Sequence, residues 1–445
     1  MGSSWAVATG GGASAVGSPT MSLYANPAHL TIGRLEAALE IRFLDLRAYA
    51  GGNLLQFDHY ADTFGSRSGT LTNAEEAKIL DAWFGEGTRS VATYAEAVPL
   101  AVTYRPPDRP WAVGVGLRVR SISETRLNRG LFDLFLIGAD SSRTVPVNGR
   151  YQAFNTVDLT GSFSYHFESI PLSVGVSPRL IFGTNYADGR LSSTVTVTDS
   201  VLTHRFDYTA RAAGGLSRQV YDTFNVFSSN PFGGVSTGGF GGGVAGFGVG
   251  VDLGATYALR PDLFVSVSIT DLGTIQWNRD AQTVTPENNK FRFDGVELNV
   301  DRLRNEFDGD VGAYFKHKVD SLARAAYEDV RRDRSSFSSA LHVGGTWSKE
   351  EYTLTGGATV GLNQVAGAVS TTPAVHLGGE YRLGPVPLRA GIRLGGPQAV
   401  TLAGGVGLDV GGFRFDLGLS VTPSTSTLGS GGHYAASLSM ATVRF

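Results

Sequence analysis

The feature that most constrains the fold is a period-two alternation of side chains that recurs along the chain. Over residues 111–120, Trp, Val and Leu alternate with Ala, Gly and Arg. This spacing is typical of a β-strand with one apolar face and one small or polar face. The same alternation returns over residues 157–167, 247–257, 375–382, 400–410 and 413–421. The repeats predict an all-β protein built from antiparallel strands.

Strand length and turn spacing narrow the architecture further. Many predicted strands run for about 10 to 13 residues, which exceeds the usual length in soluble sheets and suits a tilted strand crossing a bilayer. Very tight turns alternate with long connections, as expected when all the tight turns lie at one rim of an outer-membrane barrel. The long connections, expected to be extracellular loop insertions, are residues 50–97, 123–153, 184–243 and 271–338.

The predicted fold is a transmembrane antiparallel β-barrel of about 14 strands. The expected strands are residues 35–48, 98–105, 111–121, 154–167, 171–183, 244–258, 262–270, 339–348, 351–361, 373–382, 387–394, 399–410, 413–422 and 432–445. Residues 192–211, also extended in pattern, form either a hairpin above the membrane or further strands. A large soluble β-sandwich or propeller is the alternative. It is disfavoured because soluble strands must cover their apolar face, and no blade-like repeat is present.

The last strand carries a phase problem. Phe445 and Val443 share one face, whereas Met440, Leu438 and Tyr434 fall in the opposite phase. All five side chains can share a face only if the strand contains a bulge or a slip.

Composition excludes several other classes. No window approaches the unbroken apolar run that a transmembrane helix needs, and a net charge of −3 gives no general reason to bind nucleic acid. The absence of Cys removes disulfides and Cys-based metal sites. The opening residues lack the features of a signal peptide, so either a signal has been removed or the protein stays in the cytosol. A strand-rich membrane protein fits these limits.

No catalytic or cofactor-binding motif is present. The sequence contains no Gly-x-Ser-x-Gly elbow, no His-Glu-x-x-His pair and no phosphate-binding loop. The eight His residues are scattered without short metal-ligand spacings. We therefore expect a protein that is not an enzyme, with no cofactor and no metal site.

Residues 1–34 form a separate segment before the first strand of the barrel, which is expected to span 35–445. The segment combines GGGASAV at residues 10–16 with an Asn26-Pro27-Ala28-His29-Leu30 turn. This combination resembles the N-terminal hatch of FadL-like fatty-acid and hydrocarbon transporters, and of PorV-like barrels of type IX secretion. Residues 269–277, 293–298 and 341–347 resemble most closely an uncharacterised group of barrels from Bacteroidetes and relatives. The chain departs from the fatty-acid transporters in carrying His29 where they usually carry Gly, and in a long insertion at 299–338.

The resemblance implies a location and two candidate functions. It implies a barrel in the cell outer membrane, surrounded by lipid and lipopolysaccharide, with residues 1–34 as a hatch or plug. Capture or passage of a hydrophobic small molecule is the first expected function, with Asn26, Pro27 and His29 at the hatch. The alternative is a non-transporting scaffold that docks a protein partner through its long loops.

Three loop segments carry patterns of their own. Asn73 is expected to cap a helix over 74–84, with Gly85 ending it. Residues 320–334 are expected to form a second helix, whose Arg residues either face solvent or contact a partner or lipopolysaccharide. The Gly-rich loop from 220 to 247 is expected to pack over the barrel mouth or to form an apolar ligand entrance. Its candidate ligand residues are Phe224, Phe227, Phe232 and Phe240.

Overall fold

A computed structural model gives the arrangement of most of the chain. It describes residues 3–12, 18–32, 37–54, 72–85, 87–137, 144–198, 201–215, 243–286, 290–293, 304–306, 310, 325–329, 333–363, 365, 369–396, 400–422 and 433–445. The expected ligand residues Phe224, Phe227, Phe232 and Phe240 lie outside these ranges.

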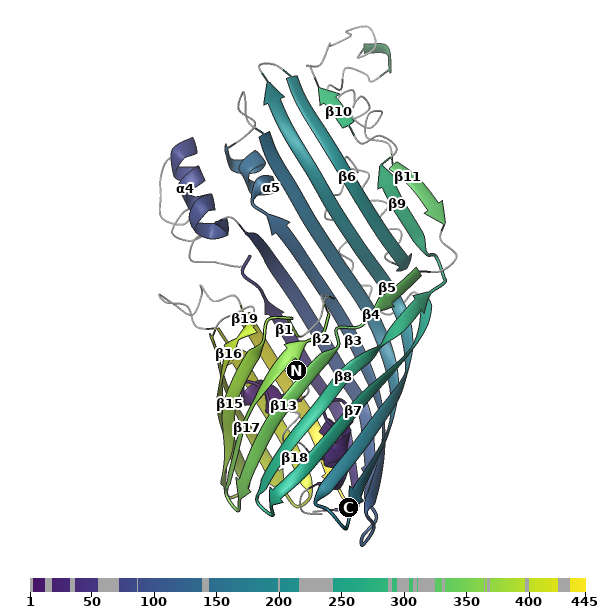
Figure 1. The fold of residues 1–445 in the computed structure, drawn as a ribbon, viewed down its shortest axis with the longest axis vertical. Helices are drawn as coiled ribbons and strands as arrows, with labels where there is room; N and C mark the ends of the chain where they lie inside the picture. Colours follow the sequence, from purple (N-terminus) through teal and green to yellow (C-terminus); the bar gives the residue numbers. More distant parts are fainter. Residues whose placement is uncertain are drawn as a thin grey trace.

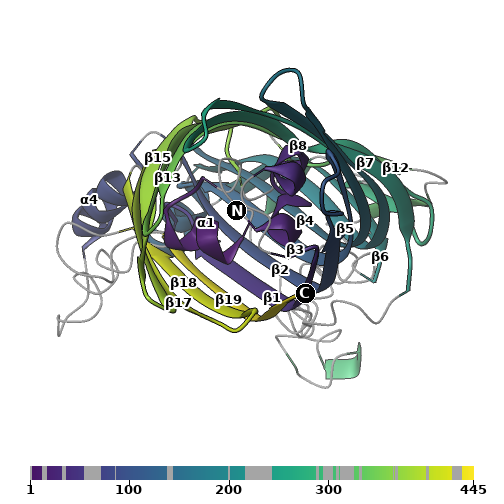
Figure 2. The same cartoon turned by 90° about the horizontal axis from the view of Figure 1, so that it is seen from below.

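Fourteen strands of the described chain close into one antiparallel barrel (Figures 1 and 2). The first strand pairs with the second and also with the last, so the wall has no free edge. The wall strands are β1 (Leu39–Gly51), β2 (Thr88–Tyr104), β3 (Trp111–Asn128), β4 (Thr144–Phe167), β5 (Leu172–Thr198), β7 (Gly246–Arg260), β8 (Leu263–Trp277), β13 (Ala340–Lys349), β14 (Tyr352–Gly361), β15 (Ala374–Leu383), β16 (Val386–Gly395), β17 (Val400–Val410), β18 (Phe413–Val421) and β19 (His433–Arg444). The predicted fold class is confirmed.

The two ends of the barrel differ in how the strands are connected. Connections of a few residues, such as Pro261–Asp262 and Gly411–Gly412, join strands at the lower end in Figure 1. Closed outer-membrane barrels carry their short turns at the periplasmic rim, so this end is the periplasmic one. The longer connections lie at the opposite, extracellular end.

Several strands continue past the barrel into segments expected to be loops. β4 has 24 residues and β5 has 27, and at about 3.3 Å per residue the longer one spans roughly 90 Å. Beyond the barrel β5 pairs with β6 (Val201–Gly214), which makes the extended segment 192–211 a hairpin above the membrane. The remaining strands of this projecting sheet are β9 (Gln282–Pro286), β10 (Lys290–Phe293) and β11 (Ala325–Asp329).

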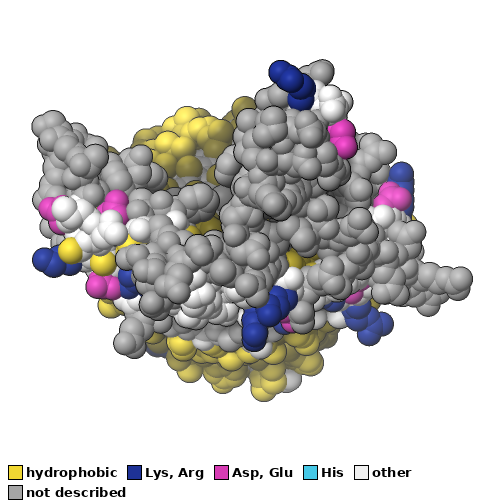
Figure 3. Space-filling view, turned by 90° about the horizontal axis from the view of Figure 1, so that it is seen from above, with side chains coloured by type: hydrophobic (Ala, Val, Ile, Leu, Met, Phe, Trp, Pro, Cys, Tyr) yellow, Lys and Arg dark blue, Asp and Glu magenta, His cyan; other side chains and the backbone are white. Residues whose placement is uncertain are grey.

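Side chains alternate between the lipid and the lumen along the wall strands. On β3, Val113, Val115 and Leu117 are exposed, whereas Arg118 and Arg120 are buried inside the barrel. Hydrophobic side chains cover the outside of the wall, as the yellow atoms in Figure 3 show. This apolar outer surface faces the bilayer, so the expected orientation of the strand faces is confirmed.

A bulge resolves the phase problem in β19. Three residues of β18, from Arg414 to Asp416, oppose four residues of β19, from Ser439 to Thr442. The extra residue lets Tyr434, Met440 and Phe445 all face outward.

The helices are short. Those outside the barrel wall are α4 (Asn73–Phe84), α5 (Gly130–Phe132) and the π-helical turn η3 (Asp133–Ile137). The predicted helix over 74–84 is present, but its N-cap is Thr72 rather than Asn73. The Thr72 hydroxyl accepts from the Glu75 N–H, while the Glu75 side chain accepts from the Thr72 backbone. Gly85 ends the helix with a φ of 56°.

The predicted helix over 320–334 is wrong in its described part. Residues 325–329 form β11, which pairs with β9, and β12 (Asp333–Ser336) pairs with β8. The Trp277 indole N–H donates to the Ser335 hydroxyl at 2.8 Å. The free edges of β8 and β9 offered backbone partners, and this pairing outweighed the amphipathic helical pattern.

Candidate functional site

The N-terminal segment lies inside the barrel, in two parts docked on different sides of the wall (Figure 2, purple). α1 (Ser4–Ala8) contacts β16 to β19, and α2 (Pro19–Ser22) contacts β1 and β2. The 3₁₀-helix η1 (Pro27–Thr31) contacts β3, β4, β5 and β7. α1 is one part, and α2 with η1 is the other. Both parts occupy the lumen between the extracellular and periplasmic openings.

The structure brings Asn26, Pro27 and His29 together at the start of η1. The Asn26 side-chain oxygen accepts from the Ala28 N–H at 3.1 Å, and its NH₂ group donates to the Thr256 hydroxyl at 3.4 Å. Pro27 occupies the first helical position, where its missing N–H is tolerated. His29 is buried, with its Nε2 3.4 Å from the Asn26 amide nitrogen. Asn26 therefore anchors the start of η1 to β7 of the wall.

Polar contacts hold the segment at two further points. The Thr20 N–H donates to the Glu40 carboxylate at 3.1 Å, and Arg42 donates to the Ser18 and Thr20 hydroxyls. At the other end of η1, the Thr31 hydroxyl lies 2.9 Å from that of Ser164 on β4. All these groups are inside the barrel, where each unpaired polar atom is costly, so the contacts favour the docked position.

Glycines on the lumen face of the wall leave room for the segment's backbone. A Cβ at Gly378 or Gly391 would overlap the Thr9 carbonyl, and a Cβ at Gly175 would overlap the backbone of Pro27 and Ala28. The high glycine content of the strands therefore has a structural use here, since it permits close approach of the docked chain.

Replacing one of these glycines should loosen the segment. We expect Gly391→Ala to lower the stability of the assembled protein by about 1–3 kcal/mol, because the added methyl group overlaps Thr9. Thermal unfolding in detergent measures the change. Gly161→Ala is the matched control, since a Cβ there meets no atom within 4 Å. Equal melting temperatures for the two variants would contradict close packing at Gly391.

A buried ion cluster crosses the lumen beside the N-terminal segment. Arg118 and Arg120 reach Asp158 at 2.8 and 2.6 Å. Asp271 accepts from Arg120 at 2.7 Å and from Arg179 at 2.6 Å. Asp271 lies in a bulge of β8 with a φ of 59°, which turns its carboxylate inward.

The cluster also contacts aromatic rings on both sides. The Arg118 guanidinium lies over the Tyr24 ring of the N-terminal segment at 4.9 Å, and Arg120 lies over Phe337 at 5.1 Å. Both are cation–π arrangements. The cluster therefore links the wall to the docked segment and to the chain entering β13.

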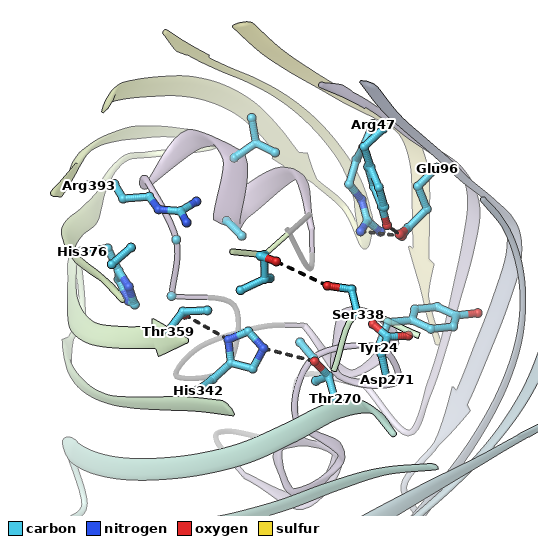
Figure 4. A pocket seen from close by; sticks show the side chains of 18 of the residues that line it. Tyr24, Arg47, Glu96, Thr270, Asp271, Ser338, His342, Thr359, His376 and Arg393 are labelled. Atoms are coloured by element: carbon cyan, nitrogen blue, oxygen red, sulfur yellow. Dashed lines mark hydrogen bonds and ion pairs between the residues drawn. The ribbon is translucent and has the colours of Figure 1, made fainter. Parts of the chain in front are cut away.

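A central cavity of about 100 Å³ opens between the N-terminal segment and the extracellular side (Figure 4). Gly10–Gly12 form part of its lining, and His342, His376 and Arg393 project into it from the wall. The His342 ring is held between the Thr270 and Thr359 hydroxyls, at 3.1 and 3.0 Å. Polar and apolar side chains both contribute to the lining.

Aromatic side chains pack at this cavity and in the buried cluster beside it. Phe154 and Phe337 pack edge to face at 6.0 Å and belong to the cavity lining. Tyr186 and Trp277 stack at 5.2 Å in the same buried apolar cluster.

A second cavity of about 660 Å³ lies on the periplasmic side of the N-terminal segment. Trp5, Pro19, Met21 and Leu30 of the segment line it, together with charged side chains of the periplasmic rim. The segment thus separates a central cavity from a periplasmic vestibule.

Sequence reasoning missed His376, Arg393 and the buried ion cluster. The tight turn at Gly384 and Pro385 could have predicted that His376 and Arg393 lie side by side. A two-residue connection fixes the register of its hairpin, so His376 must pair with Arg393. The ion cluster joins β3, β4, β5, β7 and β8, and no short-range pattern predicts that convergence.

Two features are absent from the described residues. No helix in these ranges has the length and apolarity to cross a membrane. No group of three or more His, Cys, Asp or Glu in the described chain is placed to hold a metal ion.

Comparisons with known proteins agree with the barrel. A model for a family of unknown function (DUF5723) matches residues 43–417. No curated protein matches the sequence. The structure resembles the CymD monoaromatic hydrocarbon channel, with a TM-score of 0.51 and 14% identity, covering 100% of this chain and 97% of that one. A FadL homologue from Pseudomonas aeruginosa gives a TM-score of 0.50 at 12% identity, covering 100% and 98%.

These likenesses establish the fold. The chain folds like these two proteins into a closed 14-strand β-barrel, and the apolar outer surface of its wall places the barrel in an outer membrane. The toluene transporter TodX from Pseudomonas putida is a weaker structural match, with a TM-score of 0.46 and 11% identity, covering 96% of this chain and 94% of that one.

Proposed function

The chain belongs to the family of unknown function DUF5723, and we propose that it admits hydrophobic small molecules through the barrel, without catalysing a reaction on them. The observation that carries the proposal is the position of the N-terminal segment between the central cavity and the periplasmic vestibule. A molecule that crosses the lumen must pass this segment. One structural neighbour is a monoaromatic hydrocarbon channel, which supports the same class of ligand.

The path has three parts in this proposal. Phe154 and Phe337 line the central cavity and provide the apolar contact that removes the ligand from water as it arrives from the extracellular side. The ligand then enters the central cavity above Gly10–Gly12. Displacement of η1 or α1 from the wall opens the way to the vestibule.

A cross-link tests whether η1 is the gate. The chain has no Cys, so Thr31→Cys with Ser164→Cys introduces one pair at a site where the native hydroxyls are 2.9 Å apart. Uptake of a fluorescent apolar probe, N-phenyl-1-naphthylamine, is measured in vesicles containing the double variant. We expect oxidation to abolish the uptake and reduction to restore it, because the disulfide ties η1 to β4.

Each single Cys variant is the control for the substitution itself and should respond to neither treatment. Uptake that is the same in the oxidised and reduced double variant would show that η1 does not gate the lumen. Uptake no faster than in protein-free vesicles would contradict transport altogether.

A docking scaffold is the second candidate, and the projecting sheet favours it. β5 and β6 extend far beyond the bilayer and present a broad surface with β9, β10 and β11. In this proposal the surface receives a protein partner, as in the PorV-like barrels, and lipopolysaccharide surrounds its base. We also propose, as part of this second candidate, that the chain is related to the uncharacterised barrels from Bacteroidetes. If the protein is a docking scaffold, we expect no uptake of the probe. We also expect that removal of residues 190–209 leaves the stability of the barrel unchanged.

A further inference from the structure

Arg393 and His376 form a pair of nitrogen-bearing side chains on the lumen wall. They are direct register partners on β16 and β15, and side chains in such positions lie about 4.5–5.5 Å apart at Cβ. Both line the central cavity, on the left side of Figure 4. The pair therefore presents two nitrogen-bearing groups to one space.

The other arginines that line this cavity are paired with carboxylates. Arg47 pairs with Glu96 at 2.6 Å, and Arg118 and Arg120 pair with Asp158 and Asp271. Among the described residues, the carboxylates that line the cavity are Glu96 and Asp271, both already engaged. The cavity therefore has no spare negative charge on its described surface.

Arg393 and His376 differ from those cations. Within the described part of the chain, Arg393 makes no hydrogen bond or ion pair. The phenol of Tyr49 lies within electrostatic range of the Arg393 guanidinium. His376 is 7% exposed, and its Nε2 has no hydrogen-bond partner among the described atoms. Buried polar nitrogens nearly always have a hydrogen-bond partner, and a ligand in the cavity would supply the partner that this one lacks.

The neighbouring side chains add donors and no carboxylate. Thr401 lies opposite Arg393 on β17, and Thr359 lies on β14 beside His342. The arc from β13 to β17 thus combines a guanidinium, imidazoles and hydroxyls around the cavity. Arginine in such a setting binds oxyanions through charge-assisted hydrogen bonds.

We propose that Arg393 and His376 bind the oxyanion of a molecule entering the central cavity. The chemistry is that of a phosphate group, either free or as the head group of an amphiphile. The inference deepens the proposed function and rests on it, because it adds a negative group to the apolar molecule that the lumen admits.

The same site touches the N-terminal segment. Gly11 and Gly12 lie against the His376 ring, and Gly10 lies against the backbone at Ile392 and Arg393. An anion between Arg393 and His376 therefore sits at the contact between the segment and the wall. Binding of the anion would therefore act directly on the N-terminal segment, which closes the lumen.

Binding to the full-length protein in an uncharged detergent tests the site. Three probes are compared by calorimetry: octyl phosphate, octanol and inorganic phosphate. We expect octyl phosphate to bind at least about tenfold more tightly than octanol, since a charge-assisted hydrogen bond adds to the same apolar chain. Arg393→Gln should remove this difference, His376→Gln should reduce it, and Arg393→Lys should restore part of it.

Arg126→Gln is the matched control, because Arg126 lies on β3 away from the cavity and pairs with Glu124. It should behave as the wild type, and heat-modifiable gel mobility checks that each variant is folded. Octyl phosphate and octanol binding equally to the wild type would overturn the anion site and leave hydrophobic passage standing. Phosphate binding that depends on Arg393, with octanol failing to bind, would support the anion site and contradict hydrophobic passage. Binding of none of the probes would contradict both.

Discussion

Asp158→Asn is expected to destabilise the barrel by about 3–5 kcal/mol. The substitution removes the one negative charge that Asp158 contributes to a buried ion cluster, and two buried arginines lose that charge as a partner. Asp158 is fully buried and accepts from Arg118 and Arg120. Asparagine keeps the shape of the side chain but removes its charge. Urea unfolding of the protein in lipid vesicles measures the loss.

The control uses the same substitution in an exposed ion pair. Asp280 pairs with Arg279 at 3.5 Å, and both side chains are more than half exposed. Asparagine tolerates the φ of 52° that Asp280 adopts. Asp280→Asn should change stability by less than about 1 kcal/mol, as exposed pairs do. Similar losses for the two variants would show that the cluster is not stabilised by its charges.

Leu377→Arg is expected to cost about 2–4 kcal/mol, because it places a charge on the lipid-facing wall. Leu377 is 63% exposed on β15, with its side chain directed outward. The variant should accumulate unassembled in cells, and its assembled fraction can be measured by heat-modifiable gel mobility.

Thr359→Arg adds the same side chain on the lumen side of the neighbouring strand. Thr359 lines the central cavity, where the guanidinium finds polar surroundings instead of lipid. We expect this variant to assemble at close to the wild-type level. Equal assembly defects at the two positions would mean that the inside and outside faces of the wall have been exchanged.

Local patterns predicted the wall because strand periodicity is a property of neighbouring residues. The alternation of Val113, Val115 and Leu117 with polar neighbours determined which face meets lipid. The phase conflict near Met440 likewise predicted a bulge or a slip, and the structure shows a bulge. At residues 320–334 the prediction relied on helical periodicity alone. It was wrong in the described part, because these residues pair with β8 and β9 instead.

The candidate site was only partly readable from the sequence. The segment containing Asn26, Pro27 and His29 stood out through its Gly-rich start and its Pro turn, and the structure places it inside the lumen. The expected ligand residues Phe224, Phe227, Phe232 and Phe240 lie outside the described chain and stay a prediction. Arg393 and His376 were hidden because neither residue is unusual within its own strand.

The sequence by itself predicted a wall of about 14 strands, their lipid-facing phase and the rim that carries the tight turns, because these follow from spacing within a few residues. Only the tertiary structure decided which lumen charges meet and which stay unpaired. Closure of the barrel brings Asp158, Arg179 and Asp271 together from β4, β5 and β8. It leaves Arg393 facing a cavity with no free carboxylate among the described residues. Such neighbours are set by strand register and barrel closure, which depend on the whole wall at once.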